Sequence, residues 1–167
     1  MKRALTVYYS WSNGNTEGIA KMLQKEIGGD IVRIDTITPY EGSYDDVVNQ
    51  GQEEVQRGYE PEIKPLGVNI SDYDVIAVGT PTWWYTMAPA VRTFLHTESF
   101  ADKTVIPFMT NAGWPGKVIK DMKTACKGAD IKGEMEIQFD STGGSRLETS
   151  MEDITKWVQN VKKIIND

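Results

Sequence analysis

Cysteine, histidine and long apolar runs are scarce in this sequence of 167 residues. Its one cysteine, Cys126, cannot form a disulfide within the chain and excludes a zinc or iron–sulfur site built from cysteines. No apolar run approaches the roughly 18 residues that a membrane-spanning helix needs. The first residues, 1–9, are too short and too polar at their start for a signal peptide. We therefore expect a cytoplasmic protein without a membrane segment.

Positive charge is also in short supply. The chain has 18 Lys and Arg residues against 24 Asp and Glu, a net charge of -6, which argues against a nucleic-acid partner. The excess of acid is local, because residues 41–62 contain Arg57 as their only base and seven acids: Glu41, Asp45, Asp46, Glu53, Glu54, Glu60 and Glu62. This acidic segment is either a solvated face or a docking surface for a partner protein.

Apolar and charged residues occur at ordinary levels, 40% and 25%, with a mean hydropathy of -0.41. This composition excludes a disordered chain. The length predicts one domain over residues 1–167, large enough to build a core without disulfides or metals.

Strand-like and helix-like segments alternate along the chain. Short apolar runs predict strands at 3–9, 30–35, 75–78, 104–109 and 135–139. Three- and four-residue apolar spacing predicts helices at 16–27, 88–95, 118–126 and 151–165, and an extra acidic helix at 45–57. Such alternation implies an open, doubly wound, five-stranded parallel sheet with helices on both faces, since five strands are too few for a barrel. Ligands of such sheets bind beyond the carboxyl ends of the strands.

The loop after the first predicted strand runs directly into a helix. It consists of Ser10, Trp11, Ser12, Asn13, Gly14, Asn15 and Thr16. Backbone N–H groups at a helix start form an anion site, to which the polar side chains add neutral donors. The other interpretation is an ordinary polar helix cap.

Several other kinds of site are excluded by missing motifs. The sequence has no G-x-x-x-x-G-K-[ST], no G-x-G-x-x-G after a strand and no G-x-S-x-G. No arginine near Cys126 could hold a phosphoester, so we place this cysteine on a helix face. We place His96, the only histidine, at a helix end or on the surface.

Aromatic residues follow the third predicted strand, in the order Thr80, Pro81, Thr82, Trp83, Trp84, Tyr85 and Thr86. Three consecutive aromatic residues either form a small satellite core or flank a planar ligand. The loop after the fourth strand begins Thr110, Asn111, Ala112 and Gly113 and continues through Trp114. An anion cradle and an aromatic wall at one edge fit a planar ring with a phosphate tail.

With these motifs the sequence resembles the flavodoxins. Residues 10–16 match the family's FMN phosphate loop, residues 80–84 match its first flavin loop, and residues 111–113 lie where the second belongs. The resemblance implies strand order 2-1-3-4-5 and non-covalent FMN. It assigns phosphate binding to side chains of Ser10, Ser12, Asn13, Asn15 and Thr16 and to the backbone of Trp11 and Gly14. It places the flavin ring between residues 82–86 and 110–113. Flavodoxins often carry glycine in the first flavin loop, whereas this sequence has none between Thr80 and Met87.

The resemblance favours an FMN-binding electron carrier that meets redox partner proteins, with the acidic segment available for docking. No Lys or Arg occurs in residues 10–16, 80–87 or 110–116, so the charge of reduced FMN is uncompensated and we expect a low potential. The alternative is an NAD(P)H-dependent quinone or other acceptor reductase on the same fold. A third, non-redox hypothesis is a phosphate- or nucleotide-sensing domain.

Overall fold

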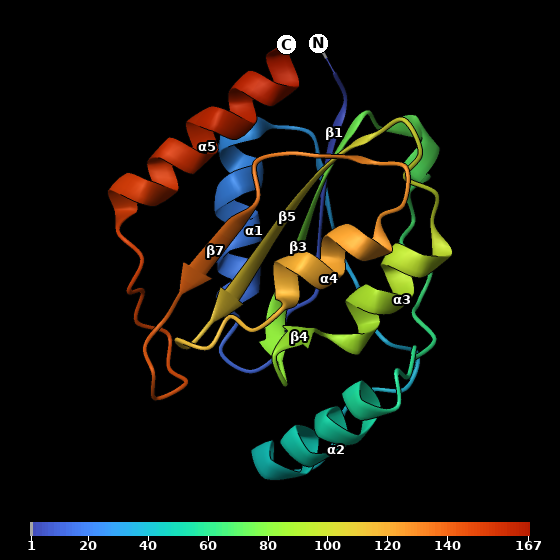
Figure 1. Ribbon diagram of the computed structural model, residues 1–167, viewed down its shortest axis with the longest axis vertical. Coiled ribbons are helices and arrows are strands. Elements are labelled where there is room, and N and C mark those ends of the chain that lie inside the picture. Colours follow the sequence, from blue (N-terminus) through green and yellow to red (C-terminus); the bar gives the residue numbers. More distant parts are fainter. Residues whose placement is uncertain (1) are drawn as a thin grey trace.

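A mostly parallel sheet forms the centre of the computed structural model, which describes residues 2–167 (Figure 1). Its strands are β1 (Ala4–Tyr8), β2 (Asp30–Arg33), β3 (Val75–Trp83), β5 (Thr104–Asn111), β6 (Asp130–Ile131) and β7 (Met135–Gln138). They are ordered β2-β1-β3-β5-β6, and β7 also pairs with β5. The predicted order 2-1-3-4-5 is confirmed, with the fifth position divided between β6 and β7.

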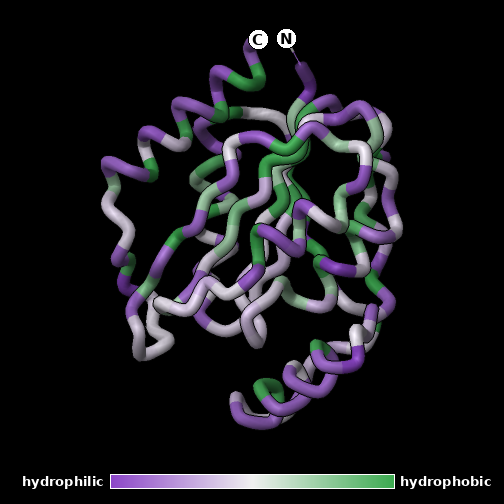
Figure 2. The backbone as a smooth tube through the Cα atoms, viewed as in Figure 1, coloured by the Kyte–Doolittle hydropathy of each residue, from purple (hydrophilic) through white to green (hydrophobic). Residues whose placement is uncertain are grey.

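The three central strands are buried because helices cover both faces of the sheet, as parallel sheets require. On one face, Leu5, Ile76 and Val105 pack with apolar residues of α3 (Pro89–Thr97) and α4 (Val118–Ala125). On the other face, Ala77 and Ile106 pack with residues of α1 (Asn15–Ile27) and α5 (Met151–Asn166). Figure 2 shows the hydrophobic segments concentrated in the central strands. No helix within residues 2–167 is long and apolar enough to cross a membrane.

The predicted acidic helix exists as α2 (Tyr44–Gln56) and begins with a capping box between Ser43 and Asp46. It lies apart from the two helix layers, near the end of the sheet at which β3 and β5 finish (Figure 1). Most of it is hydrophilic (Figure 2), but Val47 and Glu54 are buried. One side of the helix is therefore exposed to solvent, and the other side packs against the rest of the protein.

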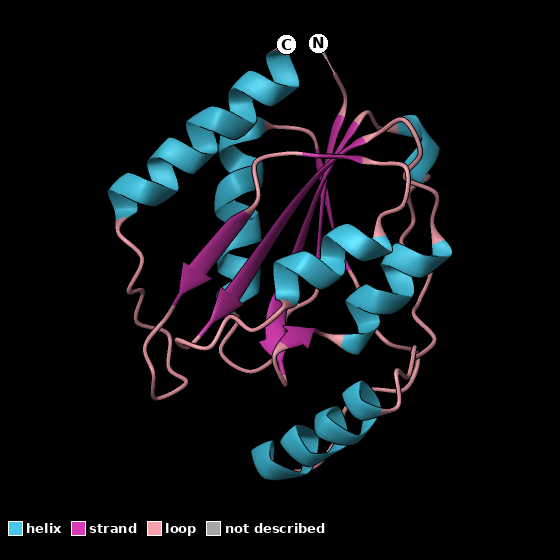
Figure 3. Cartoon of the chain, in the orientation of Figure 1, coloured by secondary structure: helices cyan, strands magenta, loops and turns pink. Residues whose placement is uncertain are grey.

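The largest difference from the elements expected from the sequence is at the end of β3. Residues 80–83, expected to form a loop, continue β3, because Thr80 and Pro81 stay in register with Met109 and Thr110 of the equally extended β5. A short antiparallel strand, β4 (Thr86–Met87), folds back on β3 (Figure 3). This hairpin was not expected, because its turn contains neither Gly nor Asn. Between α2 and β3 lie a short 3-10 turn, η1 (Ile70–Asp72), and an isolated antiparallel bridge between Ile63 and Thr36.

Gly79 is a tightly packed point of the sheet, in β3 between Tyr8 of β1 and Phe108 of β5. A Cβ atom there would come within 2.4 Å of Cε2 and Cζ of Phe108, a buried ring that packs against Trp157. We expect Gly79→Ala to lower the free energy of unfolding by about 1–3 kcal/mol, because the ring has no room to retreat. Urea unfolding measures this loss.

The matched control is Gly18→Ala in α1. A Cβ atom at Gly18 meets no heavy atom within 4 Å, and alanine is the better helix former. This variant should be as stable as the wild type or more so. Equal stability of the two variants would contradict the packing argument.

Candidate functional site

The loop of residues 10–16 lies between the carboxyl end of β1 and the start of α1. Ser12 and Gly14 take the left-handed conformation, with φ of 65° and 74°, and no side chain caps the helix at Gly14. In the described part of the chain, no acceptor receives the backbone N–H groups of residues 11–16. The loop therefore presents unpaired donors at the positive end of a helix, which is the geometry of an anion site.

Ser10 has a different role from the rest of this loop. Its side chain is buried, and its Oγ accepts a hydrogen bond from the N–H of Glu17 at 3.2 Å. The hydroxyl thus supports the first turn of α1 from within. For Ser10, the structure therefore supports the alternative of an ordinary polar residue that caps the helix, rather than a ligand of an anion.

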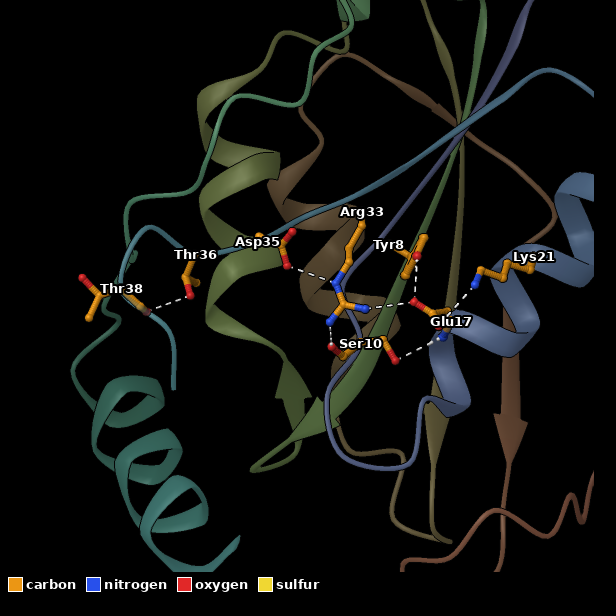
Figure 4. Close-up of polar contacts among 8 residues, drawn as sticks. All are labelled: Tyr8, Ser10, Glu17, Lys21, Arg33, Asp35, Thr36 and Thr38. Atoms are coloured by element: carbon orange, nitrogen blue, oxygen red, sulfur yellow. Dashed lines mark hydrogen bonds and ion pairs between the residues drawn. The ribbon is translucent and has the colours of Figure 1, made fainter. Parts of the chain in front are cut away.

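Arg33, at the end of β2, braces the same loop from behind (Figure 4). Its guanidinium donates to the backbone carbonyl of Ser10 at 2.8 Å, to Glu17 at 2.9 Å and to Asp35 at 3.0 Å. The carbonyl of Ser10 and the N–H of Trp11 belong to one trans peptide, in which C=O and N–H point in opposite directions. Because Arg33 holds the carbonyl, the N–H of Trp11 points away from Arg33.

Glu17 is the centre of this polar cluster. Tyr8 donates its hydroxyl to Glu17 at 2.9 Å, and this hydrogen bond, helped by Lys21 and Arg33, lowers the pKa of the carboxyl group. The two carboxylates of Glu17 and Asp35 neutralise Arg33, so it shapes the loop without adding net charge. Sequence reasoning missed Arg33, although the predicted pairing of the first two strands was a signal for it.

A cavity of about 290 Å³ opens where this loop meets the ends of β3 and β5. Twelve of the residues singled out in the sequence line it: Trp11, Ser12, Asn13, Asn15, Thr16, Pro81, Thr82, Trp83, Trp84, Thr110, Asn111 and Ala112. Thr16 and Thr110, from α1 and β5, join their hydroxyls at 2.8 Å in its floor. The structure thus brings all three predicted loops to one site.

Six singled-out residues are not in the lining: Ser10, Gly14, Thr80, Tyr85, Thr86 and Gly113. Thr80 is fully buried and its Oγ1 accepts from the N–H of Ala88 at 3.0 Å. Thr86 donates its hydroxyl to Asp121 at 2.6 Å. The side chains of Thr80 and Thr86 therefore shape the wall from outside the cavity.

Two cavity walls were not anticipated from the sequence. One is α2, which contributes Tyr44, Val47, Val48 and Gly51. Gly51 matters because a Cβ atom there would lie 3.0 Å from the ring of Trp83. The spacing of apolar residues in the acidic helix indicates that one side is buried. It does not indicate that this side lines the cavity.

The second unanticipated wall is the loop after β7, with Phe139, Gly143 and Gly144. Asn13 donates its side-chain amide to the carbonyl of Gly143, and Asn15 donates to that of Gly144 at 3.1 Å. These contacts span about 130 residues of sequence, and nothing in the local pattern indicates them.

The aromatic hairpin is both a satellite core and a cavity wall. The ring of Trp83 packs edge-to-face on Tyr40, Tyr9 and Trp11, with centroid distances of 5.0, 5.9 and 6.3 Å. Trp84 donates its indole N–H to the carbonyl of Val48 at 2.8 Å, which links the turn to α2.

The turn itself is strained, because Trp84 and Tyr85 have φ of 49° and 69°. Two-residue hairpin turns with two positive φ angles strongly prefer Asn-Gly, and bulky residues in this region cost about 1–3 kcal/mol each. The turn nevertheless stays pinned, by Val48 on one side and by Lys117, whose N–H donates to the Tyr85 carbonyl at 2.8 Å, on the other.

No carboxylate, imidazole, ammonium or guanidinium group belongs to the described lining of the cavity. The site can hold an anion through neutral donors at one end and a planar ring against Trp84, Thr82 and Ala112 at the other. It offers no general acid or base of those kinds. Its chemistry would come from a bound group.

Comparison with known proteins gives one family. Residues 3–161 match the sequence profile described as flavodoxin. The chain is 29% identical to the flavodoxin of Haemophilus influenzae over 84 residues, which are 50% of this chain and 34% of that protein. It is 27% identical to flavodoxin 1 of Escherichia coli over 79 residues, 47% of this chain and 31% of that protein. The matches thus span about a third of the length of these curated relatives.

Solved structures give matches over longer stretches. A Bacteroides eggerthii protein, inferred to be a flavoprotein, is 26% identical with a TM-score of 0.77, covering 100% of this chain and 99% of that one. A Lactobacillus acidophilus flavoprotein, solved in complex with FMN, is 23% identical with a TM-score of 0.70. That alignment covers 81% of this chain and 93% of the other, and shows a shared fold.

Asp140 organises the loop over the cavity and generates a pH prediction. It accepts hydrogen bonds from the N–H groups of Gly144 and Arg146, both at 3.0 Å, and from Thr142. The bond from Thr142 and those from the two N–H groups lower its pKa to about 2. A lowered pKa stabilises the folded state above the unfolded-state pKa of about 4, and this contribution disappears as the pH falls through about 2.

We therefore expect Asp140→Asn to lower the melting temperature at pH 5, and the difference from wild type to shrink as the pH falls toward 2. Thermal unfolding across this range measures the difference. Glu136→Gln, in an exposed side chain of β7, is the control and should leave the pH dependence unchanged. A wild-type advantage that persists at the acid end would disprove the role of the carboxylate.

Proposed function

The chain belongs to the flavodoxin family, and from this membership we propose that it binds FMN in the cavity and carries electrons between redox proteins at low potential. Two observations support FMN: the match over residues 3–161 and the FMN complex of the structurally similar Lactobacillus acidophilus flavoprotein. Bound FMN supplies reversible one- or two-electron transfer.

The residues present fit this cofactor. The unpaired N–H groups of residues 11–16, with the hydroxyls of Ser12 and Thr16, are assigned to the phosphate. Thr82 and Trp84 are assigned to one side of the flavin ring, and residues 111–112 to the other. The buried side of α2, with Val47 and Gly51, excludes water from the inner edge of the cavity.

The observation that carries the low potential is the absence of charge from the described cavity lining. Reduction adds negative charge to a cofactor that already holds a phosphate. Two charges about 4 Å apart interact by about 4 kcal/mol at an effective dielectric constant near 20, so a missing cation is costly. Arg33 does not supply it, because Glu17 and Asp35 already pair with its guanidinium.

The same helix that lines the cavity carries the docking surface we propose. On α2 the side chains of Asp45, Asp46 and Glu53 are exposed, while Val47 on its other side meets the cavity. A basic partner that meets these acids would lie close to the cofactor. Electrostatic steering of this kind speeds association more than it strengthens it.

A second function, reduction of a planar acceptor such as a quinone by NAD(P)H, is favoured by one further feature. A hollow of about 230 Å³ adjoins the cavity and is lined by Thr82, Trp84, Tyr85, Ala112 and Trp114. Tyr85 and Trp114 are 56% and 57% exposed, so a flat molecule has open access to them.

Stopped-flow reduction of the FMN-loaded protein separates the two functions. We expect one FMN per chain, no rapid reduction by NADH or NADPH, and a final reduction step below the potential of free FMN. Spectroelectrochemical titration gives the potential. Rapid reduction by either nucleotide, or a potential at or above that of free FMN, would contradict the electron-carrier function and support the reductase function.

Arg33 gives a direct test of the phosphate cradle. Arg33→Met releases the carbonyl of Ser10, so we expect FMN affinity to fall about 10- to 100-fold, the equivalent of about 1.5–3 kcal/mol for hydrogen bonds to a charged group. Riboflavin, which lacks the phosphate, should bind the variant and the wild type equally. Fluorescence titration measures both ligands.

Two variants complete this test. Arg33→Lys keeps the charge but cannot reproduce the three-way fork, and should fail to restore FMN affinity. Lys21→Met removes the other cation beside Glu17 and should leave both affinities unchanged. Equal loss of FMN and riboflavin would mean that Arg33 stabilises the fold rather than the cradle.

A further inference from the structure

A second cavity, of about 370 Å³, lies against the same aromatic turn. Its walls are the end of α2, the Trp84–Tyr85 turn, α3 and α4. Figure 1 shows α2, β4, α3 and α4 gathered at this end of the molecule. Trp84 belongs to the lining of both cavities. A molecule in the second cavity can therefore contact the turn that also lines the proposed FMN site.

Arg92 of α3 lines this cavity with unused hydrogen-bond donors. Within the described residues its side chain donates no hydrogen bond, and its Nε is buried without a partner. This nitrogen forms an ion pair with Glu60 at 3.5 Å, in a geometry that makes no hydrogen bond. Gly58, with φ of 63°, lies against the guanidinium, where a Cβ atom would come within 3.5 Å of Nη2. A guanidinium has five donors, and a buried unmet donor is costly.

Lys117 is the second cation that lines this cavity, and its side chain is exposed. Its backbone is fixed by the bond to the Tyr85 carbonyl, at the start of α4. Among residues 2–167, no acceptor or acid lies within bonding distance of its ammonium group. Two cations on one cavity, Lys117 without a partner among the described residues and Arg92 with donors beyond its ion pair to Glu60, stand out in a chain with a net charge of -6.

The acids around the cavity are already engaged. Glu54 is buried and accepts from the Tyr40 hydroxyl at 2.6 Å and from the Gln50 amide at 2.8 Å. Asp121 accepts from Thr86, as described above. Glu60 lies 3.0 Å from Nδ1 of His96. The cavity thus has open donors on its cations and satisfied acceptors on its acids.

We propose that this cavity binds a small organic anion, whose phosphate or carboxylate group pairs with Arg92 and Lys117. Arg matches either group through parallel hydrogen bonds, and Lys adds a point charge. The remaining wall is apolar and aromatic, with Val55, Tyr59 and Met87. A ligand with a flat or apolar body fits this wall better than an inorganic ion does.

Calorimetric titration of the FMN-saturated protein tests the site, because bound FMN fills the phosphate cradle. The probes are phenyl phosphate, benzoate and pyrophosphate. We expect saturable binding of one phenyl phosphate or benzoate per chain, tighter than that of pyrophosphate. Arg92→Gln and Lys117→Gln should each weaken it at least about tenfold while leaving FMN bound.

Lys120→Gln is the matched control, since Lys120 is an exposed base on the same helix outside the cavity. It should leave the affinity unchanged. The benzoate titration is also run on protein without FMN, so the site is tested whether or not FMN binds. No saturable binding of any probe up to about 10 mM, or equal binding by wild type and both cavity variants, overturns the proposal.

Discussion

Parallel pairing of β1 with β3 and of β3 with β5 is the constraint on which the rest of the molecule depends. Parallel strands finish at the same edge, so the loops that follow all three meet there. In the cavity floor, the hydrogen bond between Thr16 and Thr110 joins the first and the last of these loops. A shift of one residue in either register would turn the buried side chains to the opposite face and separate these loops.

Charge is kept out of the cavity and concentrated around it. Arg33 is held behind the loop of residues 10–16 by Glu17 and Asp35, and its hydrogen bond to Ser10 positions the backbone of that loop. The exposed acids of α2 lie on the solvent side of a cavity wall. In the function proposed above, the neutral groups would hold the cofactor and the charged groups would be left for recognition.

The aromatic turn connects these two regions. Trp84 and Tyr85 occupy a backbone conformation that favours glycine, and they stay there because α2 and α4 hold the turn from two sides. Because these contacts hold the turn in a strained conformation, a change in either contact is expected to change the conformation of the turn. Binding on one side of the turn is therefore expected to be felt on the other, through Trp84.

The sequence by itself determined the alternation of strands and helices and the three loops of the site, because these follow from local patterns. The order of the strands came from the resemblance to a family. The seven residues 10–16 were recognisable since a helix start and its donors are adjacent in sequence. Tertiary structure alone decided that Thr80 points into the fold and Trp84 toward the cavity, since the unexpected β4 hairpin sets their orientation. It alone placed α2 and the Gly143–Gly144 loop over the site, and brought Arg33 behind Ser10. These contacts join residues far apart in the chain, and only packing determines which distant surfaces meet.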